Sequence, residues 1–175
     1  MKRILSLALS TLLLLTLVAG CTKQDGDTPG KTLTTQERTD LYKTALEGVL
    51  TSEVGTGQPL VVTGDETSSF LFEILGVSAE DLDAFAMDIS LMNIKAYGIA
   101  AVYPAEGKSD AVMESLKGFI DRQKQSFEHY LVDQYEVAKN AKIEKLDDGT
   151  ILMVMSEGQE QIFTTLKAAI NEGNK

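Results

Sequence analysis

The sequence contains few of the residues from which metal sites, catalytic triads and crosslinks are made. Its 175 residues include one cysteine, one histidine and no tryptophan. A single cysteine cannot form a disulfide within the chain. Zinc sites need several histidine or cysteine ligands, and His129 is the only histidine available as the base of a catalytic triad. We therefore expect no metal, no cofactor and no catalytic residues of these kinds.

Motifs for nucleophilic and nucleotide chemistry are also missing. No Gly-x-Ser-x-Gly sequence surrounds a serine, and there is no Walker loop or dinucleotide fingerprint. The short glycine-rich segment at residues 55–57 is interpreted as a loop.

Basic residues are scarce. The chain has 16 Lys and Arg against 26 Asp and Glu, a net charge of −10. Removal of a leader that contains Lys2 and Arg3 would leave 14 against 26, or −12. No Lys/Arg cluster follows the leader, so no nucleic-acid partner is expected and an anionic bilayer should repel the domain.

The N-terminus has the three parts of a secretory signal. Lys2 and Arg3 precede an apolar stretch at residues 4–18, and the small residues Ala19 and Gly20 come directly before Cys21. The alternative, a transmembrane anchor, is disfavoured because the stretch is shorter than the roughly 20 apolar residues that span a bilayer. Hydroxyl residues also interrupt it.

Residues 17–21, Leu-Val-Ala-Gly-Cys, resemble the bacterial lipobox. The resemblance implies cleavage before Cys21 by signal peptidase II and acyl chains, such as palmitate, on that residue. Two or three chains, at about 0.8 kcal/mol per buried CH₂, would anchor the protein stably. We therefore expect a signal peptide at 1–20, the lipidated Cys21 and a flexible tether at 21–34, and a single domain at 35–173. Its expected location is the extracytoplasmic face of the cell membrane.

Four segments of this domain have the spacing of amphipathic helices. The third is the longest, and its apolar face is expected to include Phe127 and Tyr130. The second is expected to present Phe70, Leu71, Ile74 and Leu75 and to end at Gly76. The residues expected to begin the helices are Thr34, Asp65, Ser109 and Ser156, with Glu37 and Gln159 completing capping boxes.

Two β-hairpins are expected between these helices. Residues 85–91 alternate in polarity, which predicts a strand whose polar face, including Asp88, meets water. Residues 99–103 are continuously apolar and predict an inner strand. A second hairpin spans 143–155 with its turn at Asp148 and Gly149. The expected fold class is α+β, an antiparallel sheet built from two hairpins and packed against helices; the strand order stays open.

Two groups of polar residues are candidate sites. Arg122, Ser126 and His129 share one flank of the long helix, beside Ser115, and form a candidate binding edge. The alternative is that the Arg122 stem covers the core boundary and that His129 is a surface residue. The carboxylates Glu80, Asp81, Asp83 and Asp88 would suit a glycosidase. We favour the alternative, in which Asp81 caps a turn begun by Ser78 and Asp88 faces water.

The long helix and the hairpin after it resemble a known family. Residues 122–130, Arg-Gln-Lys-Gln-Ser-Phe-Glu-His-Tyr, together with the turn at Met92-Asn93 and the hairpin at 140–155, are similar to uncharacterised lipoproteins of Gram-positive bacteria that share a domain of unknown function. The similarity covers about residues 41–170. Members often place an acidic residue before the inner strand, where this chain has Tyr97-Gly98. The resemblance implies a lipoprotein signal and a small extracytoplasmic domain, and no reaction.

The leading hypothesis is a membrane-anchored, non-enzymatic binding or accessory module of the cell envelope. Its expected partners are the membrane, through the lipid on Cys21, and an unidentified envelope protein or small-molecule ligand. The rival hypothesis is a small envelope hydrolase that uses carboxylates. Two carboxylates in one cleft, one with a raised pKa, would favour the hydrolase, whereas an apolar groove would favour the module.

The anchoring hypothesis predicts that Cys21→Ser abolishes both lipid labelling and processing by signal peptidase II, because the sulfur that takes the lipid is gone. Metabolic labelling with a radioactive fatty acid measures this, and Thr22→Ala, which leaves the lipobox intact, is the control. Undiminished lipid incorporation into Cys21→Ser would refute the lipoprotein assignment.

Overall fold

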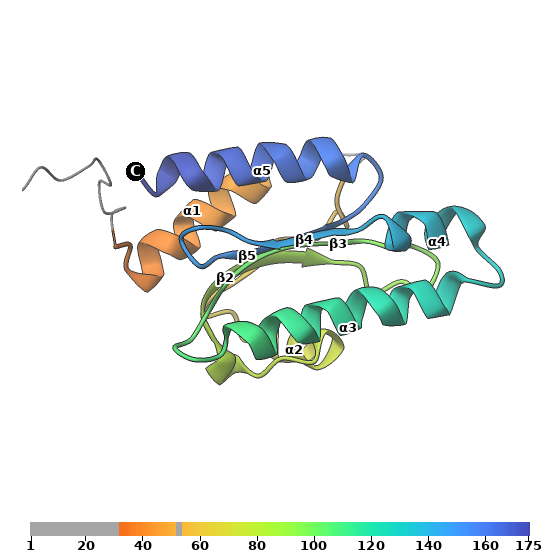
Figure 1. The fold of residues 1–175 in the computed structure, drawn as a ribbon, viewed down its shortest axis with the longest axis horizontal. Helices are drawn as coiled ribbons and strands as arrows, with labels where there is room; N and C mark the ends of the chain where they lie inside the picture. Colours follow the sequence, from red (N-terminus) through yellow and green to blue (C-terminus); the bar gives the residue numbers. More distant parts are fainter. Residues whose placement is uncertain (1–31, 52–53) are drawn as a thin grey trace, which may run out of the picture.

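The computed structural model describes residues 32–51 and 54–175. The predicted signal peptide, Cys21 and most of the predicted tether lie outside these residues. The described chain has the α+β fold that the sequence predicts, an antiparallel sheet with helices packed on it (Figure 1). The sheet has the strand order β1-β2-β3-β5-β4. Its strands are β1 (Val61–Val62), β2 (Leu82–Ile89), β3 (Gly98–Pro104), β4 (Lys142–Lys145) and β5 (Ile151–Met155).

Helices cover both faces of this sheet. In Figure 1, α1 (Thr35–Glu47) and α5 (Gln159–Gly173) lie on one face, and α2 (Ser68–Leu75) and α3 (Ser109–Phe127) lie on the other. The short helix α4 (Val132–Lys139) packs against α3, and a 3₁₀ turn, Ala79–Asp81, precedes β2. Two apolar cores result, one on each side of the sheet.

Local sequence signals explain where the first two helices begin and end. The capping box of α1 is confirmed, since Thr34 Oγ1 accepts the Glu37 N–H at 3.2 Å and the Glu37 carboxylate accepts the Thr34 N–H at 2.9 Å. Gly76 ends α2 in a left-handed conformation with a φ of 75°. The prediction that Asp65 caps α2 is wrong: the N-cap is Thr67. Asp65 instead accepts the Val62 N–H at 2.9 Å, which closes the turn after β1.

The predicted water-facing side of β2 is also wrong. Phe85, Met87 and Ile89 face the core under α2 and α3, as expected for one face of the strand. The alternate residues Ala84 and Ala86 are fully buried in the second core. Asp88 on that same side of the strand is only 4% exposed. The reason is that α1 packs over this side of β2, which the alternation of polarity alone could not show.

The long helix is shorter than expected. Its buried face is confirmed from Val112 to Phe127, but its N-cap is Lys108 rather than Ser109. The prediction that Tyr130 belongs to the core face is wrong, because α3 ends at Phe127 and Tyr130 is 58% exposed. Helix α4 follows, where the sequence pattern predicted no helix.

Arg38 connects α1 to the turn between β4 and β5 and to β3. Its Nη1 lies 2.7 Å from Asp148 Oδ2 in the β4–β5 turn, and its guanidinium lies 3.7 Å from the centre of the Tyr103 ring. One helical turn later, the Tyr42 hydroxyl is 2.6 Å from Thr150 Oγ1. Burial raises the pKa of Tyr42 to about 12, so its hydroxyl stays protonated at neutral pH. These contacts hold α1 against the sheet.

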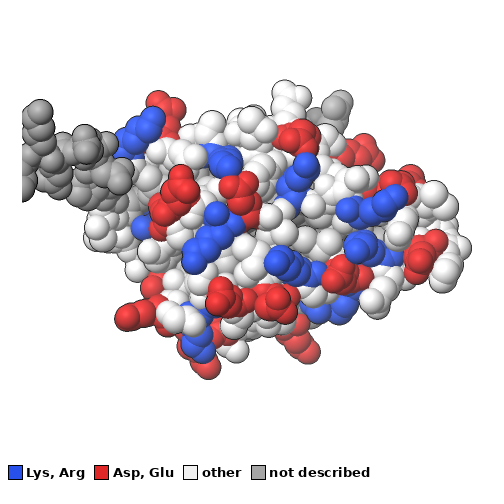
Figure 2. Space-filling model, viewed as in Figure 1, with Lys and Arg blue, Asp and Glu red and all other residues white. Residues whose placement is uncertain are grey.

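Acidic and basic side chains are interspersed on the face shown in Figure 2. Ion pairs at the surface include Lys142 with Glu160 and Lys167 with Glu144, whose Nζ and Oε1 atoms lie 2.6 Å apart. Among residues 32–51 and 54–175, no helix is both long and apolar enough to cross a membrane.

The core position of Phe127 leads to a prediction about stability. Phe127 is 1% exposed, so Phe127→Ala should lower the free energy of unfolding by about 3 to 5 kcal/mol. Phe70→Ala makes the same chemical change at a side chain that is 56% exposed and should cost less than about 1 kcal/mol. Urea denaturation of the chain from Thr22 onward measures both, and equal losses would contradict the burial of Phe127.

Candidate functional site

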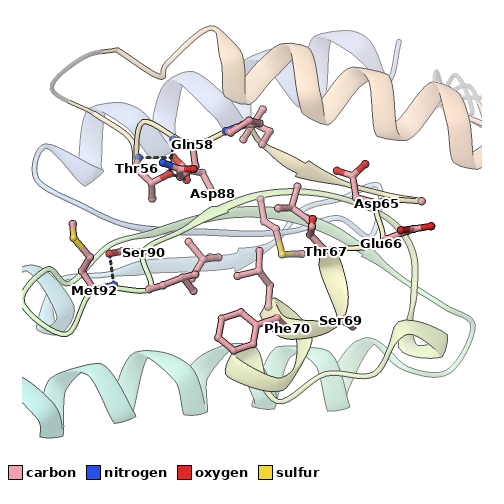
Figure 3. A pocket seen from close by; sticks show the side chains of 18 residues that line it. Thr56, Gln58, Asp65, Glu66, Thr67, Ser69, Phe70, Asp88, Ser90 and Met92 are labelled. Carbon is pink, nitrogen blue, oxygen red and sulfur yellow. Dashed lines mark hydrogen bonds between the residues drawn. The ribbon is translucent and has the colours of Figure 1, made fainter.

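An open groove of about 1030 Å³ follows the outer edge of β2. Met87 and Ile89 of β2 line it, and it lies between the loop that leads into β1 and the beginning of α2. Figure 3 shows Thr56, Gln58 and Asp88 on one side of the groove and Phe70 on the opposite side. The two sides therefore come from different parts of the chain, with β2 between them.

Asp88 holds the loop that forms the first side. Its two carboxylate oxygens accept hydrogen bonds from the Thr56 hydroxyl and, at 3.0 Å, from the Thr56 N–H. The Tyr97 hydroxyl donates a third hydrogen bond, also at 3.0 Å. A buried carboxylate is costly unless it is hydrogen bonded, and these contacts satisfy that requirement. They fix the loop above the α1-facing side of β2.

The groups around Asp88 reinforce this arrangement. Burial is the larger cause, and the neighbouring Asp88 carboxylate the smaller, of a pKa of Tyr97 well above its usual range. The phenol therefore keeps its proton and acts as a hydrogen-bond donor to Asp88. Lys95 Nζ donates to the Gly55 carbonyl at 3.3 Å and lies 4.9 Å from the centre of the Tyr97 ring. The loop is thus bonded to β2 and to the β2–β3 turn.

The second side of the groove is apolar and exposed. Phe70 at the start of α2 is 56% exposed, and Leu91 and Met92 just after β2 are 59% and 56% exposed. The segment after β2 is nevertheless held in place by side chains that bond to its backbone. Tyr130 donates to the Asn93 carbonyl at 2.6 Å, and the Gln134 side chain accepts the Ala96 N–H at 2.9 Å.

The three residues of the predicted binding edge make different contacts. Arg122 Nη2 donates to the Ile74 carbonyl at 2.7 Å, and Ser115 Oγ donates to the Gly76 carbonyl at 2.7 Å, so both cap the end of α2. Ser126 lines a smaller groove of about 370 Å³ beside Met92. The His129 side chain is 87% exposed and lies beyond the end of α3. Of the three, only Ser126 lines a groove, and a binding role for this edge stays a prediction.

The four candidate carboxylates are likewise used in different ways. Asp81 accepts the Ser78 N–H and pairs with Lys108 at 2.8 Å, a contact that lowers the pKa of Asp81. Glu80 and Asp83 are exposed, and Asp88 is buried with Thr56 and Tyr97. Within the described part of the chain, no group of three or more His, Cys, Asp or Glu side chains could hold a metal ion.

Sequence reasoning missed the groove, although one signal for it was present. Two of the residues alternating with the apolar face of β2 are alanines, which are apolar and small enough to lie under a packed helix. A carboxylate on the same side, Asp88, would then be expected to be buried and hydrogen bonded. The exposed positions of Phe70 and Leu91 carried no such signal, because both residues fit the apolar faces predicted for their elements.

The role of Asp88 leads to a second stability prediction. Asp88→Ala would leave the buried Tyr97 hydroxyl without its acceptor and release Thr56, so unfolding should become easier by about 3 kcal/mol. Asp83→Ala, at an exposed residue near the start of the same strand, should change stability by less than about 0.5 kcal/mol. Urea denaturation compares the two, and a loss no larger for Asp88→Ala than for Asp83→Ala would show that Asp88 does not anchor the loop.

The structure can now be set beside known proteins. Comparisons with curated proteins and with solved structures gave no match. A family model described as "Domain of unknown function (DUF4358)" matches residues 62–156, which run from the end of β1 to the residue after β5. This span is shorter than the 41–170 expected from the sequence, and it leaves out α1 and α5. Because the match covers more than half of the 175 residues, the chain belongs to the DUF4358 family.

Proposed function

We propose that the protein is an extracytoplasmic lipoprotein, anchored by acyl chains on Cys21, whose domain is a non-enzymatic binding module of the cell envelope. One observation carries the binding role. Phe70 of α2, together with Leu91 and Met92 just after β2, exposes apolar side chains in the groove at one edge of the sheet. Large apolar side chains that gather in a concave surface mark interaction sites. The resemblance of residues 17–21 to a lipobox supports the anchored location.

The contacts of the candidate carboxylates favour binding over hydrolysis. A carboxylate hydrolase needs one acid with a raised pKa facing a second carboxylate across the substrate. The ion pair with Lys108 lowers the pKa of Asp81 instead. Asp88 is occupied by three hydrogen bonds that hold the loop, which is a structural use of the carboxylate. No specific observation favours the hydrolase hypothesis.

A photo-crosslinking experiment in intact cells tests the binding role. Leu91→p-benzoylphenylalanine places a photoreactive group in the groove, and Val132→p-benzoylphenylalanine places it at a residue that is 69% exposed and lines neither groove described above. We expect a discrete crosslinked product from position 91 that is absent from position 132. The product should disappear when Phe70→Ser is added. Identical products from the two positions, or none from position 91, would contradict binding in the groove.

A further inference from the structure

The outer edge of β2 is only partly paired. Strand β1 has two residues, and its register places Val61 opposite Met87 and Val62 opposite Ala86. Continuing that register would place Pro59 opposite Ile89. A proline has no N–H to donate, and β1 begins only at Val61. Ile89 therefore lies beyond the last residue of β2 that pairs with β1, and it lines the groove.

The hydrogen bonds on both sides of β2 show which way the Ile89 backbone points. On the β1 side, Thr63 N–H donates to the Phe85 carbonyl at 3.1 Å. On the β3 side, Ser90 N–H donates to the Tyr97 carbonyl at 3.1 Å. The backbone N–H and carbonyl groups of successive residues point to alternate edges of a strand. From Phe85 to Ile89, the backbone groups of odd-numbered residues therefore point toward β1 and those of even-numbered residues toward β3. The N–H and carbonyl of Ile89 thus point outward, into the groove.

The two edges of the sheet differ in how well they are protected against the addition of another strand. At the β4 edge, Lys142, Glu144 and Lys145 place charges along the strand, a common means of preventing the addition of another strand. At the β2 edge, the residues from Met87 to Met92 include no lysine, arginine or proline, and the exposed side chains Leu91 and Met92 are apolar. Of the two edges, that of β2 from Met87 to Met92 is the one without exposed charged side chains to oppose the addition of a strand.

The charge of the groove selects among ligands. Asp65, Glu66 and Asp88 line it, whereas none of its lining residues is Lys, Arg or His. Figure 3 shows Asp65 and Glu66 together at one end, with Met92 at the other. The acyl chains of a lipid would satisfy neither outward-pointing backbone group of Ile89, and an anionic headgroup would meet these carboxylates. A positively charged peptide with apolar side chains fits both features.

We propose that the groove binds an extended, positively charged peptide segment of a partner protein, which adds as an antiparallel strand to the edge of β2 at Ile89. This inference rests on the proposed binding role and specifies its ligand. The residue paired with Ile89 has its side chain on the same face as the Ile89 side chain, the face covered by α2 and α3. Apolar residues should therefore alternate with basic ones, with the apolar side chains directed toward Phe70.

The register determines which peptide amides face β2. In an antiparallel pair, the residue opposite Ile89 directs both its N–H and its carbonyl at Ile89. In a peptide of alternating valine and lysine, the amide of the valine opposite Ile89 should thus bond to β2, and the lysine amides should face away. N-methylation of the two sets separates these roles while changing size and flexibility equally.

The probe is a blocked, fluorescently labelled octapeptide of alternating valine and lysine, titrated into the chain from Thr22 onward, which retains both cores and every described element. Fluorescence anisotropy should show saturable binding. N-methylation of the valines should weaken the binding by about tenfold or more, and N-methylation of the lysines should have little effect. A valine–glutamate peptide should not bind. Phe70→Ser and Leu91→Ser should weaken the binding, and Val132→Ser should not.

The remaining outcomes separate this inference from the binding role itself. Equal affinity of the two methylated peptides, or a loss confined to the lysine-methylated one, overturns antiparallel strand addition. If such a result accompanies groove-specific crosslinking in cells, the binding module stands and only its ligand is wrong. Saturable binding of monomeric lysophosphatidylcholine without binding of any peptide assigns the groove to lipids and overturns the inference. If neither crosslinks nor peptide binding are found, both proposals fail.

Discussion

The fold depends on one constraint: its central strands are apolar on both faces. Leu152 and Met153 are neighbours on β5 with side chains on opposite sides, and both are fully buried. A sheet of this kind needs a helical layer on each face, since either face left open would expose a large apolar surface. One layer comes from the middle of the chain, as α2 and α3. The other comes from its two ends, as α1 and α5, which lie together in Figure 1.

The same constraint produces the candidate site. Because the α1-facing side of β2 is an interior surface, the carboxylate of Asp88 must find hydrogen bonds within the protein. It finds them in Tyr97 and in the loop at Thr56. The loop is thereby held over the α1-facing side of the sheet, where Thr56 and Gln58 line one side of the groove. One side of the groove is thus fixed by the hydrogen bonds that satisfy a buried charge.

Sequence patterns predicted the elements well where the signal is local. The capping box at Thr34, the glycine that ends α2 and the two hairpins depend on neighbouring residues, and all are present in the structure. Local signals also misplaced the start of three helices, whose N-caps are Thr67, Lys108 and Gly158 rather than Asp65, Ser109 and Ser156. The other errors concern what packs over an element or where a helix ends. Asp88 was expected in water because a strand with one apolar face does not reveal a second helical layer. Tyr130 was placed in the core because a helical wheel continues past the residue at which the helix ends.

The site was less predictable than the fold for a related reason. Its sides come from the loop near Thr56, the start of α2 and the end of β2, and no spacing within a single segment connects them. The polar residues singled out instead, Arg122 and His129, are prominent in the sequence because their types are rare there. In the structure Arg122 caps α2, so a rare charged residue performs a helix-end function that many residue types could perform.

The family match covers only part of the residues that form the groove. Residues 62–156 include β2, Phe70 and Leu91, so the open strand edge and the apolar side of the groove belong to the matched region. Thr56, α1 and α5 lie outside it. Asp88 lies inside, and its bonds to Thr56 connect the matched region to the flanking segments. The flanking helices α1 and α5 therefore cover one face of this chain's sheet, and the bonds from Asp88 to Thr56 fix the flanking loop as one side of the groove in which we propose that a peptide binds.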